Sequence, residues 1–466
     1  MKELAEIYSY RPRMSAFLSR LESKTGRTEE KREILPGELF LGFSSPEFST
    51  KNVVAPRLDL IVTEGGRRIW KPMNMLFLGP PGAGKSGLMS VVGFNNIIRR
   101  YDVYGIIPDL SPNPEWHLHK DPITKMLKGS AAREVEEFLT QFHDEKGEIR
   151  PEGYPGIVYK PASSARYMEK GIDKELSISL PDVRALNYFN PDEGIATLLT
   201  LTGLKDSHSA LKTAESLIAD EESKKLSSAT AKLRQGKDES KVFLDRLEAL
   251  LKGKILSDSE SESQIIDDLA ASRFLVFRQT TGNAANESIA AERNQTAFNV
   301  IMSRTANERR RFVSGTQAER MESKIRKPLV YLFDEMHKAA PREGTSYIRD
   351  IVDFTVLHER KNGSMVLGAT QFPSKVSLPI LNSARAIFVS GLEGDDKSSN
   401  DILDFLRSVG FANSIDLLTS MDQKVTTSIG TNVNQCAMLR PDVRGEGRIT
   451  FFYPNISYSG IHFTYA

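Results

Sequence analysis

The sequence predicts an α/β protein with a mostly parallel β-sheet, helices on both faces of the sheet, and an inserted helical subdomain. Two apolar runs predict the sheet. Met75–Leu78 ends in a glycine-rich turn, and the residues after that turn can continue as a helix. Leu329–Phe333 is followed by two carboxylates. About 250 residues separate the motifs, far more than a minimal strand–helix–strand unit needs, so a large insertion is expected between them.

Length and composition are those of a globular protein. The 466 residues give room for two or three domains, or for one large domain with insertions, and 39% of them are hydrophobic. No apolar run approaches the roughly 18 residues that cross a membrane, and the first residues lack the apolar core of a signal peptide. A cytoplasmic protein with no membrane partner is therefore expected. The single cysteine, Cys436, excludes an internal disulfide framework and a cysteine-cluster metal site.

The charge balance is close to neutral. Lys and Arg number 62 against 61 Asp and Glu, a formal net charge of +1. This balance argues against a sequence-reading DNA-binding protein that is covered in positive charge. It is compatible with a ring that contacts DNA only in a central channel.

The glycine-rich turn fits the pattern G-x-x-x-x-G-K-[ST] and predicts a nucleotide-binding site. Its glycines let backbone N–H groups turn inward around phosphate oxygens, and the following helix points its positive end at the same anion. Lys85 is placed to reach the β- and γ-phosphates of ATP, and Ser86 to offer its hydroxyl to Mg²⁺. The residues expected to bind ATP are Gly79, Pro80, Pro81, Gly82, Ala83, Gly84, Lys85, Ser86 and Gly87.

The two carboxylates after Leu329–Phe333 are expected at the carboxyl edge of the sheet, where ligands bind in such folds. Asp334 would hold Mg²⁺, directly or through water. Glu335, one residue on, is suited to polarise the attacking water. The alternative is a buried strand followed by a solvated acidic turn. The glycine-rich turn at 79–86, a P-loop, makes this alternative much less favoured.

A further strand is predicted at residues 365–371, and it ends in Gln371. A glutamine at that point can lie between the two motif strands and sense the γ-phosphate or orient water. The polar end of a surface strand is the alternative.

The motifs divide the chain. The N-terminal segment 1–70 is expected to flank the core, with strands at 39–43 and 58–62. The ATPase core is expected in two parts, residues 71–204 and 271–456, separated by the inserted helical subdomain at 205–270. Residues 457–466 form a tail. Within the core, strands are expected at 103–107, 156–160, 176–180, 273–277, 386–390 and 448–453, and helices at 130–141, 289–312 and 402–406. The acidic, serine-rich stretch 257–268 is predicted to be a solvated loop.

Together these pieces resemble the HerA–FtsK superfamily of ring-forming P-loop ATPases, and most closely the archaeal HerA-like DNA translocases and helicases. Residues 334–344 are similar to the family's Asp-Glu-Ala-His and the Pro-Arg-Glu-Gly turn after it. Residues 360–363 resemble its Gly-Arg-Lys-x-Gly, and 369–371 match its Ala-Thr-Gln strand. The resemblance covers most of residues 70–456.

This resemblance implies a RecA-like core that hydrolyses ATP with Mg²⁺ and moves along double-stranded DNA as a homo-oligomeric, hexameric ring. It assigns Lys85 and Ser86 to the phosphates and Mg²⁺, Asp334 to the metal, Glu335 to the catalytic base and Gln371 to sensing the γ-phosphate. The family also has an N-terminal β-barrel of roughly a hundred residues that meets a nuclease partner. The P-loop here begins at residue 79, so a full barrel is not expected, and a nuclease partner would have to use a reduced one.

Arg360 is the candidate arginine finger, acting on the nucleotide of the neighbouring subunit, and Arg385 is the second choice. A solvated arginine at a helix end is the alternative for Arg360. This chain also has Glu359 where the family has a glycine.

Two other constellations carry weaker hypotheses. His117 and His119, with His143 later, suit ordinary loop histidines better than a metal site, because no cysteine or carboxylate pair accompanies them. A basic run predicts either a channel lining that neutralises DNA phosphates or a solvated helix face. It consists of Arg304, Arg309, Arg310, Arg311, Arg320, Lys324, Arg326 and Lys327.

The function predicted from the sequence is an ATP-driven duplex DNA translocase. The sequence does not distinguish among genome packaging, DNA-end processing and conjugation as the role of such a translocase. One alternative is a AAA+-like protein-remodelling ATPase, although that group usually places Asn where Gln371 stands. The other is an ATP-binding switch or scaffold with little turnover, against which Asp334 and Glu335 argue.

Overall fold

The computed structural model describes part of the chain, and the predicted helix at 130–141 lies outside the described residues. The described residues are 38–39, 41–47, 53–58, 60–64, 67–98, 101, 103–109, 117–118, 157–161, 173–176, 178–179, 195, 198–199, 202, 204, 207–220, 225–236, 239–252, 256–257, 263–272, 274–278, 287–343, 348–392, 396–427, 432–441, 448–454 and 461–462.

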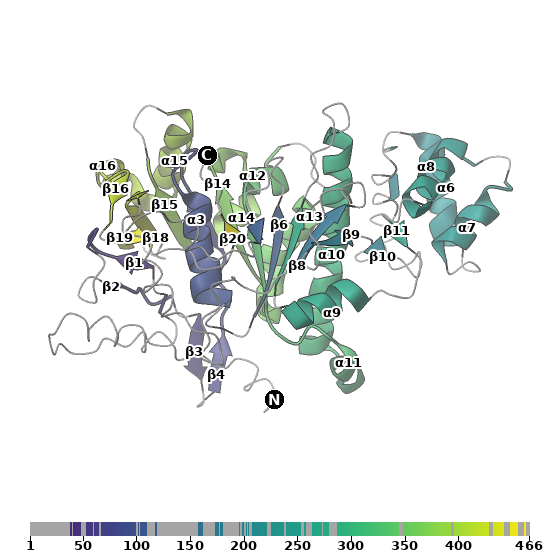
Figure 1. Cartoon of the computed structure of the whole chain (residues 1–466), viewed down its shortest axis with the longest axis horizontal. Helices are drawn as coiled ribbons and strands as arrows, with labels where there is room; N and C mark the ends of the chain where they lie inside the picture. The colour runs from purple at the N-terminus through teal and green to yellow at the C-terminus, as the bar shows by residue number, and fades with distance from the viewer. Residues whose placement is uncertain are drawn as a thin grey trace.

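A twelve-stranded sheet forms the centre of the protein, in the order β2-β1-β19-β18-β15-β5-β14-β13-β6-β12-β8-β9 (Figure 1). From β15 to β9 all neighbours are parallel, whereas β18, β19, β1 and β2 pair antiparallel at one edge. The predicted α/β fold class is therefore confirmed. The strands are β1 (Gly42–Phe43), β2 (Val53–Val54), β5 (Met75–Leu78), β6 (Tyr104–Asp109), β8 (Ile157–Pro161), β9 (Asp173–Leu176), β12 (Phe274–Arg278), β13 (Leu329–Phe333), β14 (Met365–Thr370), β15 (Ala386–Ser390), β18 (Cys436–Arg440) and β19 (Arg448–Pro454).

The central strands are buried on both faces, which is why they are continuous apolar runs rather than alternating ones. In β5, Met75 and Phe77 pack on one face and Leu76 and Leu78 on the other. The first face is covered by α3 (Lys85–Ser90) and the π-helical turns of η2 (Val91–Ile98) that continue it.

Several helices contribute buried residues to the core on the second face, so both faces of the sheet are covered as predicted. They include α10 (Glu287–Ser314), α12 (Met336–Ala339), α13 (Arg349–His358), α14 (Leu378–Ser383), α15 (Lys397–Leu406) and α16 (Ile415–Thr419). The short α11 (Gln317–Glu322) follows α10 and opens with a capping box between Thr316 and Glu319. Of the helices in the described parts of the chain, none is long and apolar enough to cross a membrane.

The long segment between the two motifs both extends the sheet and adds helices. Strands β8, β9 and β12 lengthen the parallel sheet beyond β6. Helices α6 (His208–Ala219), α7 (Leu226–Leu233) and α8 (Lys241–Lys252) lie together at one end of the molecule (Figure 1). Most of the described residues between 207 and 252 are thus helical, as the apolar period predicts.

The prediction of a solvated loop at 257–268 is wrong over its second half. Helix α9 (Ser263–Ser272) begins there. Ile266 and Leu269, three residues apart, are buried on one side of the helix, whereas Asp267 between them is exposed. The burial of this short apolar stripe outweighs the polar composition that predicted a loop.

Four small two-stranded sheets surround the core: β3 (Ile61–Glu64) with β4 (Arg67–Trp70), β7 (His117–Leu118) with β20 (Ile461–His462), β10 (Ile178–Ser179) with β11 (Leu256–Ser257), and β16 (Val425–Thr426) with β17 (Asn432–Val433). The strand predicted at 176–180 is thus divided between the end of β9 and β10. Two residues of the C-terminal tail, Ile461 and His462, form strand β20.

Candidate nucleotide site

Three neighbouring parallel strands bring the sequence motifs to one edge of the sheet. Strand β14 lies between β5, which leads into the P-loop, and β13, which leads into Asp334. In the register of the sheet, Thr370 pairs with Leu78 and Gly368 with Phe333, so all three strands end at nearly the same level. Gln371, which follows β14, therefore lies between the ends of the two motif strands, where the sequence predicted it.

The P-loop has a backbone that requires glycine. Gly82 and Gly84 have φ of +74° and +86°, in the left-handed region, and an added Cβ at either would have no heavy atom within 4 Å. The space beside the loop is therefore open at these positions. Helix α3 starts at Lys85, whose side chain is 6% exposed, while Ser86 and Gly87 are partly exposed at its first turn.

Residues far along the chain support the P-loop from the side. Asn434 Nδ2 donates a hydrogen bond to the Ala83 carbonyl oxygen over 3.1 Å. A Cβ at Gly79 would lie 2.7 Å from the Ser390 carbonyl, and one at Gly391 would lie 2.8 Å from the Ala83 Cβ. The end of β15 and the β16–β17 hairpin thus pack closely on the loop. The sequence offered no local signal for these contacts.

Both motif carboxylates are buried where β13 ends. Asp334 is 4% and Glu335 8% exposed. Glu335 has φ +60° and ψ +54°, a left-handed conformation that is uncommon for a residue with a side chain. Such backbone strain persists only where the surroundings enforce it, and it concentrates at functional sites.

Gln371 and His337 contact the two carboxylate oxygens of Glu335. Gln371 Nε2 donates to Oε1 over 2.9 Å, and His337 Nδ1 lies 3.3 Å from Oε2. His337 Nδ1 also lies 3.1 Å from Thr370 Oγ1. Burial lowers the pKa of His337, and the negative charge of Glu335 opposes this shift only in part. The imidazole is therefore neutral at pH 7.

The residues at this edge fit a Mg²⁺–nucleotide complex. The open, left-handed glycine turn suits a phosphate group, and the Ser86 hydroxyl and Asp334 carboxylate are the hard oxygen ligands that Mg²⁺ prefers. Over the described part of the chain, no group of three or more His, Cys, Asp or Glu is placed to hold a metal ion by itself. Mg²⁺ is commonly held by one or two carboxylates together with substrate phosphates and water.

The two candidate arginine fingers lie at the opposite, amino edge of the sheet. Arg360 comes before β14, is exposed, and donates from Nε to the Pro72 carbonyl over 3.2 Å. Arg385 comes directly before β15, and its backbone N–H donates to the Asn74 carbonyl over 2.9 Å. Neither is brought to the chain's own P-loop, and a role in a neighbouring subunit stays a prediction.

Several side chains of the basic run contact protein groups. Arg309 is 1% exposed; it donates from Nε to the Asn362 carbonyl over 2.7 Å and from Nη1 to the Arg326 carbonyl. Arg310 Nη2 lies 2.7 Å from Oε1 of Glu359, a carboxylate that is 1% exposed.

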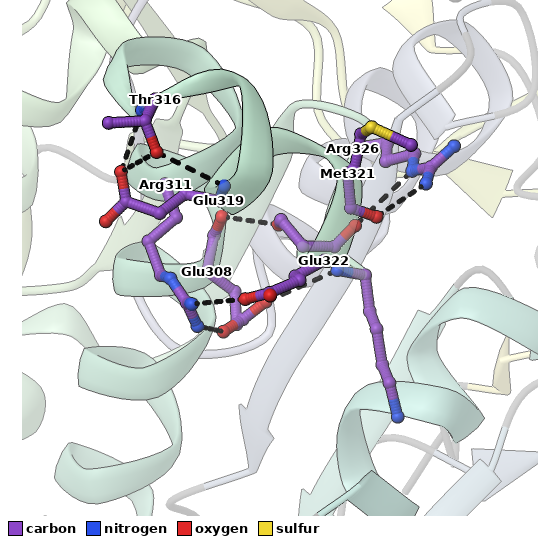
Figure 2. Close-up of polar contacts among 9 residues, drawn as sticks. Glu308, Arg311, Thr316, Glu319, Met321, Glu322 and Arg326 are labelled. Atoms are coloured by element: carbon purple, nitrogen blue, oxygen red, sulfur yellow. Dashed lines mark hydrogen bonds and ion pairs between the residues drawn. The ribbon is translucent and has the colours of Figure 1, made fainter.

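Figure 2 shows the neighbouring part of the basic run, at the end of α10 and in α11. Arg311 bonds Glu308 and Glu322 at 2.9 and 3.3 Å, and Arg326 donates to the Met321 carbonyl over 3.2 Å. Both hypotheses for the run, a DNA-channel lining and a solvated face, are therefore wrong for Arg309, which is a core residue. Of the histidines considered for a metal, His117 lies in β7, and His119 and His143 lie outside the described residues.

Comparison with known proteins gives a structural likeness only. No protein-family model matches the chain, and no curated protein matches it. Among solved structures, the chain is similar to the genome-packaging NTPase B204 from Sulfolobus turreted icosahedral virus 2 in complex with ATPγS, with 12% identity, 41% of this chain and 72% of that chain covered, and a TM-score of 0.25. It is also similar to the DNA-packaging ATPase B204 from Sulfolobus turreted icosahedral virus, with 9% identity, 41% and 70% covered, and a TM-score of 0.25. At these values the likeness carries no functional argument.

Proposed function

We propose that this chain is a Mg²⁺-dependent ATPase that drives movement along duplex DNA as a homo-oligomeric, hexameric ring. One observation carries the ATPase part: Gln371, at the end of β14, donates to the Glu335 carboxylate at the end of β13, and the P-loop follows the next strand, β5. A base, a polar residue that orients water and a phosphate cradle thus share one edge of the sheet.

Each residue then has a defined part in the reaction. The backbone N–H groups of the P-loop and the Lys85 ammonium bind the phosphates, and Ser86 and Asp334 hold the metal. The Mg²⁺ that these two residues would hold would supply positive charge beside the phosphates. Glu335 accepts a proton from the attacking water, and Gln371 orients that water. Arg360 of a neighbouring copy stabilises the charge that develops on the transferred phosphoryl group.

The DNA part of the proposal has a different basis. It is supported by the resemblance of residues 329–373 to the ring-forming DNA translocases. Arg309 contributes nothing to it, because its guanidinium group is buried and bonds to backbone carbonyls.

ATP turnover with and without linear duplex DNA, at low and moderate salt, tests the proposal. Wild type is compared with Glu335→Gln, which keeps the shape of the side chain and removes the base. Removing a general base costs about 10²- to 10⁴-fold in kcat, so a loss of at least 100-fold is expected. DNA should stimulate the wild type, and the stimulation should weaken as salt rises because phosphate contacts release counterions.

The other outcomes identify other functions. Turnover that ignores DNA would overturn the DNA motor and favour a protein-remodelling ATPase. Nucleotide binding without turnover in the wild type would favour a switch. A nucleotide titration of Lys85→Ala, expected to bind about 10- to 100-fold more weakly, tests whether the P-loop is the binding site.

A further inference from the structure

We propose that His337 is a positioning residue for the catalytic base: it holds the second carboxylate oxygen of Glu335 and ties it to the end of β14. The inference rests on the proposed ATPase function and deepens it by naming a residue that acts through Glu335. The sequence marked His337 only as part of a resemblance and gave it no role.

The two oxygens of the Glu335 carboxylate have different donors. Oε1 accepts from Gln371 Nε2 at 2.9 Å, and Oε2 lies 3.3 Å from His337 Nδ1. A carboxylate oxygen can only accept, so the tautomer that fits this contact carries its proton on Nδ1, and this one N–H is shared between Thr370 Oγ1 and Glu335 Oε2. With Oε1 bonded by Gln371 and Oε2 facing His337, two groups from separate elements define one orientation of the carboxylate.

His337 joins the base to the strand that carries Gln371. Its Nδ1 lies 3.1 Å from Thr370 Oγ1, and the Phe372 N–H donates to the same hydroxyl over 3.1 Å. Thr370 is fully buried, so its hydroxyl is a fixed point at the end of β14. The ring also packs edge-to-face on Phe372, with 5.9 Å between the ring centres. Glu335 is thus linked to the last residue of β14, Thr370, through His337, and directly to Gln371, the residue that follows it.

Packing against β14 also fixes the backbone beside Glu335. Met336 packs onto Gly368 of β14, where any Cβ would clash with the Met336 side chain. This contact keeps α12 against the strand, and it accompanies the strained left-handed conformation of Glu335. The base is therefore placed by packing at its backbone and by polar contacts at its carboxylate.

A separation between binding and catalysis follows. If Gln371 leaves Glu335 to orient the attacking water, His337 is the group that still faces the Glu335 carboxylate. Misplacing a catalytic group by about 1 Å can cost 100-fold in rate, so His337→Ala is expected to lower kcat by about 10- to 100-fold. The KM for ATP and the affinity for nucleotide should change less than about twofold, because His337 is not part of the P-loop.

Two isosteric replacements test positioning rather than bulk. The amide nitrogen of Asn can occupy the place of Nδ1, whereas that of Gln reaches only the place of Nε2. We therefore expect His337→Asn to recover most of the kcat lost in His337→Ala, and His337→Gln to recover little. Lys338→Ala, at the exposed neighbouring position of α12, should behave as wild type.

The experiment measures steady-state ATP turnover of the full chain for these variants beside wild type and Glu335→Gln, with binding of a fluorescent ATP analogue and thermal melting on each. An unchanged kcat in His337→Ala, with Glu335→Gln inactive, would overturn the role of His337 and leave the ATPase intact. Equal losses in the Asn and Gln variants would reduce His337 to a packing residue. No turnover in wild type above Glu335→Gln would overturn both proposals.

Discussion

At the scale of single residues, the site depends on how burial changes the chemistry of polar groups. His337 is partly buried between Glu335 and the end of β14, and burial lowers its pKa more than the Glu335 charge raises it. Lys338, Lys375 and Lys85 lower it further. The neutral histidine therefore lies beside the Glu335 carboxylate, at 3.3 Å, without adding a positive charge to it. A base must keep its charge to accept a proton from water.

This shift predicts how stability depends on pH. The folded pKa of His337 lies below its ordinary value of 6.5, so the unfolded chain binds a proton more readily than the folded one. The contribution of His337 to stability is fully present above about pH 6.5 and is lost as pH falls towards the folded pKa. Urea unfolding at about pH 7.5, 6.5 and 5.5 should show a steeper loss for wild type than for His337→Asn. Parallel curves for the two proteins would contradict this assignment.

The sequence predicts single residues well where a motif dictates backbone and chemistry together. Lys85, Ser86 and Asp334 lie at the edge of the sheet where the pattern placed them. It predicts poorly where a partner is distant. The three consecutive arginines at 309–311 read as an exposed charged run, but the Asn362 and Arg326 carbonyls make Arg309 a core residue. Charge is visible in the sequence, whereas its partners are set by the fold.

At the scale of elements, β14 organises the site. Its Gly368 receives Met336, its Thr370 faces His337, and Gln371 directly after it contacts Glu335. The strand itself follows from a buried apolar run that ends in a polar residue, which the sequence shows. Its position between β5 and β13 depends on long-range pairing. The sequence therefore predicts where the strand begins and ends, whereas the full order of the strands comes from the structure.

The β16–β17 hairpin is a second element with a role beyond its own segment. Asn434, directly after it, accepts from the Lys424 N–H at 2.8 Å and donates to Ala83 in the P-loop. Asn434→Ala removes one hydrogen bond of about 1 kcal/mol from the loop, so the KM for ATP should rise about fivefold with kcat nearly unchanged. Asn432→Ala, exposed in β17, is the control, because its side chain bonds Thr426 within the hairpin. A fall in kcat at constant KM in Asn434→Ala would assign this residue to the chemical step instead.

Helix α9 shows what composition misses at this scale. Serines and acids dominate residues 257–268, yet Ile266 and Leu269 are enough to fold the second half as a helix against the core. A short apolar stripe is weak evidence in a sequence and decisive in a structure, because burying each such side chain stabilises the fold by about 1.5–3 kcal/mol.

At the scale of the whole molecule, the two edges of the sheet have different roles. The carboxyl edge holds the groups of the proposed chemistry. The amino edge holds a network in which Glu359, 1% exposed at its side chain, accepts from Arg310 at 2.7 Å and from Asn362 at 2.8 Å. Arg309 joins the same network through the Asn362 carbonyl. The end of α10 is thereby connected to the turn that leads into β14.

This division predicts which acidic residue stabilises the fold. Glu359→Ala removes a buried acceptor shared by two donors and should lower the free energy of unfolding by about 2 kcal/mol. Glu322, the partner of Arg311, has a side chain that is 70% exposed. Glu322→Ala should therefore change the free energy of unfolding by less than about 0.5 kcal/mol. Urea denaturation of both variants gives the comparison. Equal effects would mean that the amino edge is no more than a solvated charged surface.

The bond between Asn434 and Ala83 also sets an order in time. The two residues are 351 positions apart in the chain, although they touch in the fold. On a ribosome that adds about 5–20 residues per second, the P-loop is made roughly 20 to 70 seconds before the asparagine that supports it. A growing chain therefore carries the P-loop for most of its synthesis without this support. The P-loop therefore receives this support only after all the parallel strands of the sheet, β5 to β15, have been made.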